Sequence, residues 1–171
     1  MHFKKEALLD LLPYGGSFLF LDEVSVDEKV DINGSFAGEG FYKIPNPEES
    51  RIMADHFPGC PVFPGHLKME AVAQLAAVIF IAKQSGDDSV LPVLTQSSFE
   101  LKTMAIPGDT LLLKATICVK GRAIEVVGEI ICGANTSSGM IKGIAMPKGI
   151  FGRMAKRKEK KEQLNQTVLN L

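Results

Sequence analysis

The chain has 171 residues, of which 46% are hydrophobic and 23% are charged, and its formal net charge is −1. This composition is typical of one globular domain that is long enough to bury a core without disulfides. The near-neutral charge gives no sign of a nucleic-acid partner. The longest apolar run, residues 75–82, is shorter than the roughly 20 residues of a membrane span, so we expect no membrane partner.

The cysteines indicate a reducing environment. Cys60, Cys118 and Cys132 are odd in number and scattered, without the spacing of a metal site. The first residues lack the apolar segment of a signal peptide. We therefore expect a cytoplasmic protein without a bound metal.

The first half of the chain predicts a helix, two strands and a long loop. Residues 4–12 have the pattern of a short amphipathic helix, which ends at a proline and a glycine pair. Residues 17–26 and 30–37 are apolar enough to form two paired strands. Residues 45–49, with two prolines, and residues 57–65, which are dense in proline and glycine, predict loops.

Residues 67–83 predict a buried helix. Nearly every position is apolar, so such a helix has no face suited to water and must lie inside the fold.

The second half of the chain predicts strands joined by turns. Strand-like alternation covers four segments: 99–102, 111–119, 124–130 and 140–146. Residues 107–109, 121–122 and 135–139 predict the turns between them. The fold class is therefore α+β, with one buried helix wrapped by an antiparallel sheet, and pairing in a homodimer would cover a free sheet edge.

The C-terminal segment differs in charge from the rest of the chain. Residues 151–171 hold six basic and two acidic side chains, a net charge of +4, which leaves −5 on residues 1–150. We expect a single domain over residues 1–150 and a basic tail over 151–171. The tail is either a solvated extension or a segment that attracts an acidic carrier protein.

Three polar residues lie on one face of the predicted helix. His66, Glu70 and Gln74 are spaced by four positions, so their side chains form a stripe. A buried carboxylate is costly unless it is paired or neutral, which favours a functional reason for Glu70. The alternative is that Glu70 lies near solvent at the helix start, and a lone loop histidine such as His56 is more often structural than catalytic.

Together these residues form a specific motif. The segment 55–65 reads DHFPGCPVFPG, and an acidic residue follows five positions after its last glycine, with a glutamine four positions further on. This motif resembles the 3-hydroxyacyl acyl-carrier-protein dehydratases, and a looser likeness extends over about residues 8–147. The resemblance implies the hot-dog fold, in which a long central helix is wrapped by an antiparallel sheet.

The resemblance also implies a reaction and roles. The enzyme would remove water from a 3-hydroxyacyl thioester and give the trans-2-enoyl thioester in fatty-acid synthesis, with no metal or redox cofactor. His56 would be the base, and Glu70 would serve the hydroxyl group, oriented by Gln74. The N–H of Gly65 would polarise the thioester carbonyl, and Pro64 and His66 would line the substrate site.

The resemblance further implies partners. The substrate would be carried by acyl carrier protein or coenzyme A. In this family the histidine and the acid come from different subunits, so we expect a homodimer, either alone or as the unit of a trimer of dimers.

The chain departs from the family pattern at several positions. Asp55 replaces a common glycine and either orients His56 or faces solvent. His66 replaces a small or apolar residue and either pairs with Glu70, lines the pocket or points outward. Tyr14-Gly15-Gly16 stands where a His-Arg pair is usual, and Cys60 has no histidine spaced to activate it. These departures leave two alternatives: a thioesterase or hydratase on the same fold, or a non-catalytic module that binds an acyl chain or a carrier protein.

Overall fold

The computed structural model describes residues 1–31, 34–84, 89–102 and 104–149. The predicted basic tail over 151–171 lies outside the described residues, and so does the boundary expected at residue 150.

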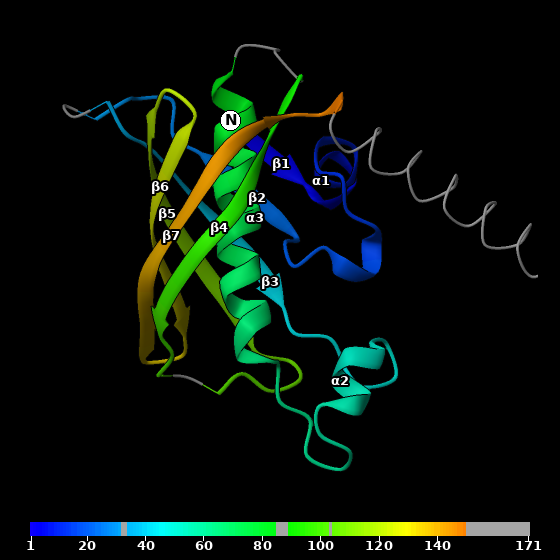
Figure 1. Ribbon diagram of the computed structural model, residues 1–171. Helices are drawn as coiled ribbons and strands as arrows, with labels where there is room; N and C mark the ends of the chain where they lie inside the picture. Colours follow the sequence, from blue (N-terminus) through cyan, green and yellow to red (C-terminus); the bar gives the residue numbers. More distant parts are fainter. Residues whose placement is uncertain (32–33, 85–88, 103, 150–171) are drawn as a thin grey trace, which may run out of the picture.

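One antiparallel sheet of seven strands curves around a central helix, α3 (Gly65–Lys83) (Figure 1). The strand order is β1-β2-β3-β5-β6-β7-β4, and every neighbouring pair is antiparallel. The strands are β1 (His2–Lys4), β2 (Glu23–Val26), β3 (Phe36–Lys43), β4 (Val90–Glu100), β5 (Thr110–Lys120), β6 (Ala123–Cys132) and β7 (Asn135–Pro147). The expected α+β architecture is confirmed.

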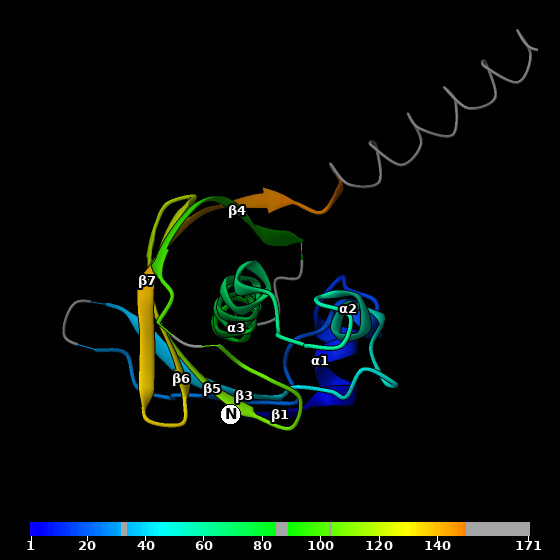
Figure 2. The same cartoon turned by 90° about the horizontal axis from the view of Figure 1, so that it is seen from below.

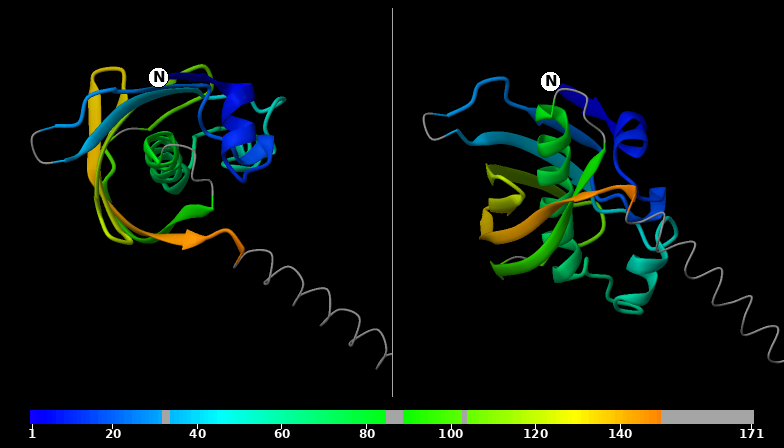
Figure 3. Two further views of the ribbon diagram at one scale, coloured as in Figure 1. Left: turned by 90° about the horizontal axis from the view of Figure 1, so that it is seen from above. Right: turned by 45° about the horizontal axis from the view of Figure 1, so that its top comes forward.

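Two short helices lie on the side of α3 that the sheet leaves open. They are α1 (Lys5–Leu11) and α2 (Arg51–Asp55), and a 3₁₀ turn, η1 (Gly16–Phe18), follows α1. Seen along α3, the sheet bends around one side of the helix while α1 and α2 stand on the other (Figure 2). The views in Figure 3 show the same enclosure. The core therefore forms between α3 and the concave face of the sheet.

The buried helix expected over 67–83 is confirmed and begins two residues earlier. Ten of its 19 residues are buried, because the sheet packs against its apolar side chains. Its length and hydropathy would also suit a membrane span, but core helices share those properties, and just over half of its apolar window, 56%, is buried inside the protein.

Three of the four strands expected in the second half are confirmed, but the strand expected over 99–102 is wrong in its bounds. It is the end of β4 (Val90–Glu100), whose first part was missed because Pro92 and the polar residues 95–98 interrupt its apolar pattern. In β5, Leu111, Leu113, Ala115 and Ile117 are buried, and in β6 the even-numbered positions face the core in the same way. Gly121 turns the hairpin between them with a φ of 61°, a left-handed conformation that glycine adopts without strain.

Three further boundaries predicted from sequence are wrong. The strand expected over 17–26 is limited to Glu23–Val26, because Gln74 takes the backbone groups of Phe18 and Phe20. The strand expected over 30–37 is found at Phe36–Lys43.

The third error concerns residues 135–139, which begin β7 rather than form a turn. The turn precedes them at Gly133, whose φ is 58°. The elements β1 and α2 were not expected at all, because three and five residues are too short to show a periodic pattern.

The sheet has two edge strands of different character. β1 is three residues long, whereas β4 has 11 residues and carries an exposed Leu94. A long edge strand with exposed apolar groups offers backbone N–H and C=O groups for pairing with another chain.

Candidate active site

His56 lies directly after α2, and its ring is fixed by the loop that follows. Its Nδ1 is 2.7 Å from the carbonyl oxygen of Val62, and its ring stacks on Phe57 with centroids 4.0 Å apart. A carbonyl oxygen only accepts hydrogen bonds, so the neutral ring carries its proton on Nδ1. The lone pair of Nε2 is then free to accept a proton, as a general base must.

The backbone closes the same loop. The N–H of Val62 donates to the carbonyl oxygen of His56 at 2.8 Å, and the N–H of Phe63 donates to Ala105 at 2.8 Å. The loop is thus tied both to itself and to the segment before β5, which fixes the position of the histidine.

Asp55 does not orient His56. It is exposed, and its carboxylate pairs with Arg51 at 3.4 Å, one turn back on α2. Of the two alternatives for Asp55, the structure favours the one in which it faces solvent. Cys60 is also exposed and contributes its backbone to the loop, with its N–H donating to Phe57 at 2.9 Å.

The N-terminus of α3 presents backbone donors. Pro64 is the N-cap, and its carbonyl oxygen accepts from the N–H groups of Leu67 and Lys68. In the described part of the chain, the N–H of Gly65 has no acceptor, as is usual for the first residues of a helix. Such a donor, at the positive end of the helix dipole, suits an oxygen that gains negative charge.

His66 is exposed on the first turn of α3. Among the described residues it makes no ion pair with Glu70, although the two are one turn apart. The arrangement favours the alternative in which His66 points outward.

Glu70 is half-buried on the second turn of α3 and is held by Gln74. The side-chain nitrogen Nε2 of Gln74 donates to Oε1 of Glu70 at 3.1 Å and to the carbonyl oxygen of Phe18 at 2.9 Å. The Oε1 of Gln74 accepts from the N–H of Phe20 at 2.9 Å. Gln74 is fully buried with these bonds made, so it both orients Glu70 and attaches the segment after α1 to α3.

Tyr14 is the second partner of Glu70. Burial, the negative charge of Glu70 and the interaction of the tyrosine hydroxyl with that carboxylate together raise the pKa of Tyr14 to about 12. The sequence showed Tyr14 only as a departure from the family pattern. The only sequence feature that pointed to this contact was the residue type: an aromatic ring with a hydroxyl group stands where the family usually has another residue.

A narrow cavity of about 50 Å³ begins at Glu70 and Tyr14 and runs along α3. Three small residues of the helix, Ala73, Ala76 and Ala77, form one wall, and apolar residues of β4, β6 and β7 form the other. An apolar cavity that ends at one carboxyl group is suited to an acyl chain whose polar end reacts.

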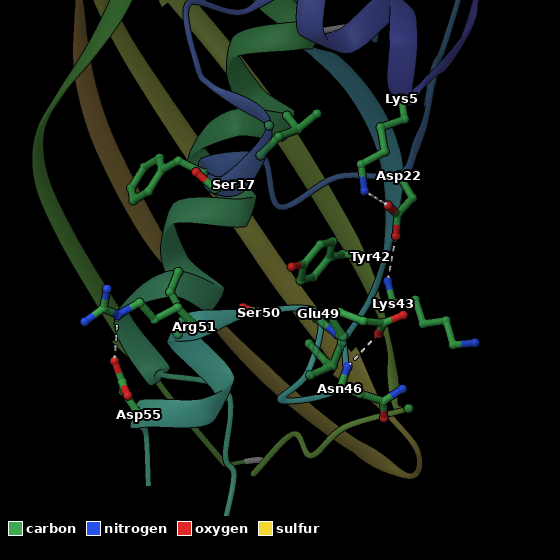
Figure 4. Close-up of a pocket in the computed structure, with 17 residues that line it drawn as sticks. Lys5, Ser17, Asp22, Tyr42, Lys43, Asn46, Glu49, Ser50, Arg51 and Asp55 are labelled. Atoms are coloured by element: carbon green, nitrogen blue, oxygen red, sulfur yellow. Dashed lines mark hydrogen bonds and ion pairs between the residues drawn. The ribbon is translucent and has the colours of Figure 1, made fainter. Parts of the chain in front are cut away.

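A larger cleft of about 1020 Å³ lies between α1, η1 and α2 (Figure 4). Four of its six charged side chains form ion pairs with each other: Lys5 contacts Asp22 at 2.6 Å, and Arg51 contacts Asp55. Neither His56 nor Glu70 lines it. We therefore do not assign the reaction to this cleft.

Among the described residues, His56 lines neither the narrow cavity of Glu70 nor the cleft between α1 and α2. Glu70 lines the narrow cavity along α3, whereas His56 lies in the loop beyond α2 and is absent from its walls. The residues expected to react with one substrate are thus presented by two separate parts of the fold.

One polar residue of α3 was overlooked in the sequence. Lys68 is 3% exposed, and burial lowers its pKa. It lies near Cys132, whose pKa is raised by burial and by Asp109, with Sγ 3.7 Å from Oδ2 of Asp109.

The fold and this site define a hot-dog protein with an apolar cavity beside a carboxyl group. Solved structures of the same fold include a hot-dog-like protein from Thermanaerovibrio acidaminovorans, at 13% identity and a TM-score of 0.57 over 71% of this chain and 89% of that one. The dehydratase heterocomplex ApeI:P from Xenorhabdus doucetiae matches at 16% identity and a TM-score of 0.64, covering 86% and 96%. At these identities the likeness shows the fold alone.

Sequence relatives give the family. The model of the FabA-like domain matches residues 12–132, and the chain belongs to this family. The 3-hydroxyacyl-[acyl-carrier-protein] dehydratase FabZ of Rickettsia felis is 36% identical over 112 residues, 64% of this chain and 72% of that protein. The bifunctional enzyme LpxC/FabZ of Chlorobaculum tepidum is 29% identical over 145 residues, and the chain spans 29% of its length. The family expected from the motif is confirmed.

Proposed function

We propose that this protein removes water from a 3-hydroxyacyl thioester, with His56 and Glu70 as the reacting side chains. Dehydration in fatty-acid synthesis is the activity of the relatives in its family and the one expected from its sequence. The observation that carries the residue assignment is the Nδ1 contact of His56, which leaves Nε2 free to take a proton.

The reaction needs a base, an acid and a stabilised oxygen. Nε2 of His56 takes the C2 proton, and the electron pair of that bond moves towards the thioester carbonyl as an enolate. The pair then forms the C2–C3 double bond as the C3–O bond breaks. Glu70 supplies a proton to the departing hydroxyl, directly or through a water molecule, so that it leaves as water.

The N–H of Gly65 supports the enolate step. Its position before the first helical hydrogen bond of α3 leaves it available to the thioester oxygen. A donor that stabilises this oxygen as charge develops lowers the barrier, and in other enzymes the loss of one such donor costs about 10²–10³-fold in rate.

We propose that the active form is a homodimer paired through β4. The separation of His56 from the cavity of Glu70 supports a site completed by a second copy. The long free edge of β4 and its exposed Leu94 support this strand as the interface. A two-fold axis would create two equal sites, each with His56 from one copy and Glu70 from the other.

Mixing two inactive variants tests this arrangement. His56→Ala and Glu70→Ala proteins are unfolded together and refolded as a mixture. Random pairing makes half of the dimers mixed, and each mixed dimer has one intact site of two, so about one quarter of wild-type activity should return. If His56 and Glu70 of the same chain react together, no activity returns.

The activity itself is tested with two thioesters. A 3-hydroxyacyl thioester and a trans-2-enoyl thioester, on acyl carrier protein and on coenzyme A, are incubated with the protein, and both interconversion and free thiol are followed. We expect interconversion that His56→Ala abolishes and that His2→Ala, at an exposed histidine, preserves. Release of free thiol instead identifies a thioesterase, and binding without turnover identifies a binding module.

We further propose that the substrate is carried by acyl carrier protein and that the reaction takes place in the cytoplasm. The relatives act on carrier-bound chains according to their names. The comparison of the two carriers in the assay above tests the first point, through the ratio of the two kcat/KM values.

A further inference from the structure

Tyr14 lies where two cavities of the fold meet. It lines the narrow cavity of about 50 Å³ that begins at Glu70, and it also lines a second cavity of about 680 Å³ beside α1 and β4. The two cavities share five wall residues: Tyr14, Ala77, Pro92, Val93 and Leu94. Of these, Tyr14 has the largest side chain.

The ring is held in place from two sides. It packs against Phe18, with centroids 5.8 Å apart, and its hydroxyl meets the carboxylate of Glu70. Phe18 is itself fixed, because its carbonyl oxygen accepts a hydrogen bond from Gln74. The same glutamine that orients Glu70 therefore also holds the backbone of the residue on which the Tyr14 ring packs.

The length of the narrow cavity follows from the helix. Its walls extend along α3 from Glu70 to Ala77, seven positions that correspond to about 10 Å of helix rise. The second cavity continues beside Ala77, and its walls include the apolar residues Leu11, Leu12, Pro13 and Leu91. Without the ring of Tyr14, an acyl chain that fills the first cavity would have apolar space to enter.

We propose that Tyr14 sets the longest acyl chain that the enzyme accepts, because its ring, fastened to Glu70, separates the acyl cavity from the second cavity. This inference rests on the proposed dehydratase function. It assigns Tyr14 two linked tasks: the ring limits the chain, and the hydroxyl keeps both the ring and the carboxylate in position.

Two variants separate the two tasks. Tyr14→Ala removes the ring and joins the cavities, whereas Tyr14→Phe keeps the ring and removes the hydroxyl. Tyr42→Phe is the matched control, because Tyr42 is the other tyrosine of the chain and lines the cleft between α1 and α2 instead. Should Tyr14→Ala fold poorly, Tyr14→Leu provides a smaller and still apolar side chain.

Two measurements are made on the intact chain. The first is the binding of saturated acyl thioesters of increasing chain length, which cannot lose water. The second is kcat and KM for 3-hydroxyacyl thioesters of the same lengths. Because the first readout needs no turnover, a failure of the proposed dehydratase function leaves the test of Tyr14 intact.

We expect Tyr14→Ala to bind chains longer than the wild-type limit at least about tenfold more tightly than wild type, since each added methylene buried contributes roughly 0.8 kcal/mol. Tyr14→Phe should keep the wild-type limit and lower kcat by about tenfold at every length with little change in KM, because a hydrogen bond to a charged group is lost. Tyr42→Phe should change neither.

An unchanged chain-length profile in folded Tyr14→Ala and Tyr14→Leu would overturn the proposal. So would an equal loss of affinity for all lengths, which would mean that Tyr14 contacts the carrier arm rather than the end of the chain. If Tyr14→Phe has the same kcat as wild type, the hydroxyl of Tyr14 does not position the carboxylate of Glu70.

Discussion

Gln74 donates a hydrogen bond of 3.1 Å to Glu70 one turn earlier on α3, and it does so from a fully buried position. The same amide holds the backbone of Phe18 and Phe20. One side chain therefore connects the acidic residue of the site to the N-terminal segment that carries Tyr14. The geometry of the site and the packing of residues 14–20 depend on the same hydrogen bonds.

Replacing Gln74 by leucine should damage stability and activity together. Gln74→Leu leaves the N–H of Phe20 buried without a partner and removes the partner of the part-buried carbonyl of Phe18, which should cost about 1–3 kcal/mol of unfolding free energy. Urea denaturation measures this loss. Gln84→Leu, at the C-cap of α3, is the control and should change the unfolding free energy by less than about 0.5 kcal/mol. Equal stability of the two variants would contradict the role assigned to Gln74.

Replacing Gly65 by alanine should affect activity more than stability. A Cβ at this position would lie 2.7 Å from Cδ1 of Leu101, a side chain that is 40% exposed and can turn away. The melting temperature should therefore change little. The methyl group, however, crowds the N–H proposed to bind the thioester oxygen, and kcat should fall about tenfold to a hundredfold.

A second substitution shows whether the steric effect at Gly65 is direct. In Gly65→Ala combined with Leu101→Ala, the methyl group has no neighbour to displace. We expect activity to stay low, since the methyl still occupies the space of the substrate. Recovery of activity would mean that the movement of Leu101, and not the blocked N–H, caused the loss.

The sequence predicted the parts of this fold that depend on long periodic patterns. Alternation in β5 and β6 and the apolar stretch of α3 are each about ten residues or more, so the side chains alone indicate which face is buried. β3 was misplaced because Gly38 and Gly40 interrupt its apolar pattern. Both are needed there, since a Cβ would lie 3.0 Å from Ile79 at Gly38 and 3.1 Å from Leu21 at Gly40.

The residues of the sequence motif could be predicted, whereas the residues that reach the site through contacts between distant parts of the chain could not. His56, Gly65, Glu70 and Gln74 were expected from the motif together with the family that it resembles. Tyr14 lies 56 positions before Glu70, and only the folded chain places it beside the carboxylate. The carbonyl oxygen of Val62 accepts a hydrogen bond from the proton on Nδ1 of His56. It is a backbone group, so no sequence pattern predicts this contact.

The two tyrosines should titrate together at high pH. They are the only tyrosines of the chain, which has no tryptophan, and both have a pKa raised from 10.0 to about 12. Near-ultraviolet absorbance should therefore show a single step near pH 12 in the folded protein and near pH 10 in urea. A step near pH 10 in the folded protein would contradict the burial of both rings.

The same shift makes stability depend on pH. The folded state binds the tyrosine protons more tightly than the unfolded state, so their contribution is complete below pH 10 and is lost as the pH rises from 10 to about 12. Tyr14→Phe should remove the part of this loss that Tyr14 causes. Urea unfolding of both proteins at pH 9 and pH 11 measures the difference, and equal pH dependence of the two proteins would count against the shift at Tyr14.

Gly139 in β7 should tolerate no side chain. A Cβ there would lie 2.2 Å from the carbonyl oxygen of Ser98 and 2.5 Å from Cγ of Phe99, and both atoms belong to the neighbouring strand β4. Backbone cannot move aside without breaking the pairing of the two strands, so Gly139→Ala should lower the unfolding free energy by about 3 kcal/mol or more. Gly149→Ala has no atom within 4 Å of its Cβ and should leave stability unchanged.

Because β4 is the proposed dimer edge, Gly139→Ala should also weaken association. Sedimentation at a series of protein concentrations would then show dimers of wild type and Gly149→Ala at concentrations where Gly139→Ala is monomeric. If Gly139→Ala loses stability but dimerises as well as wild type, the interface lies elsewhere than on β4. If it loses neither, the close contact between β7 and Phe99 does not exist in solution.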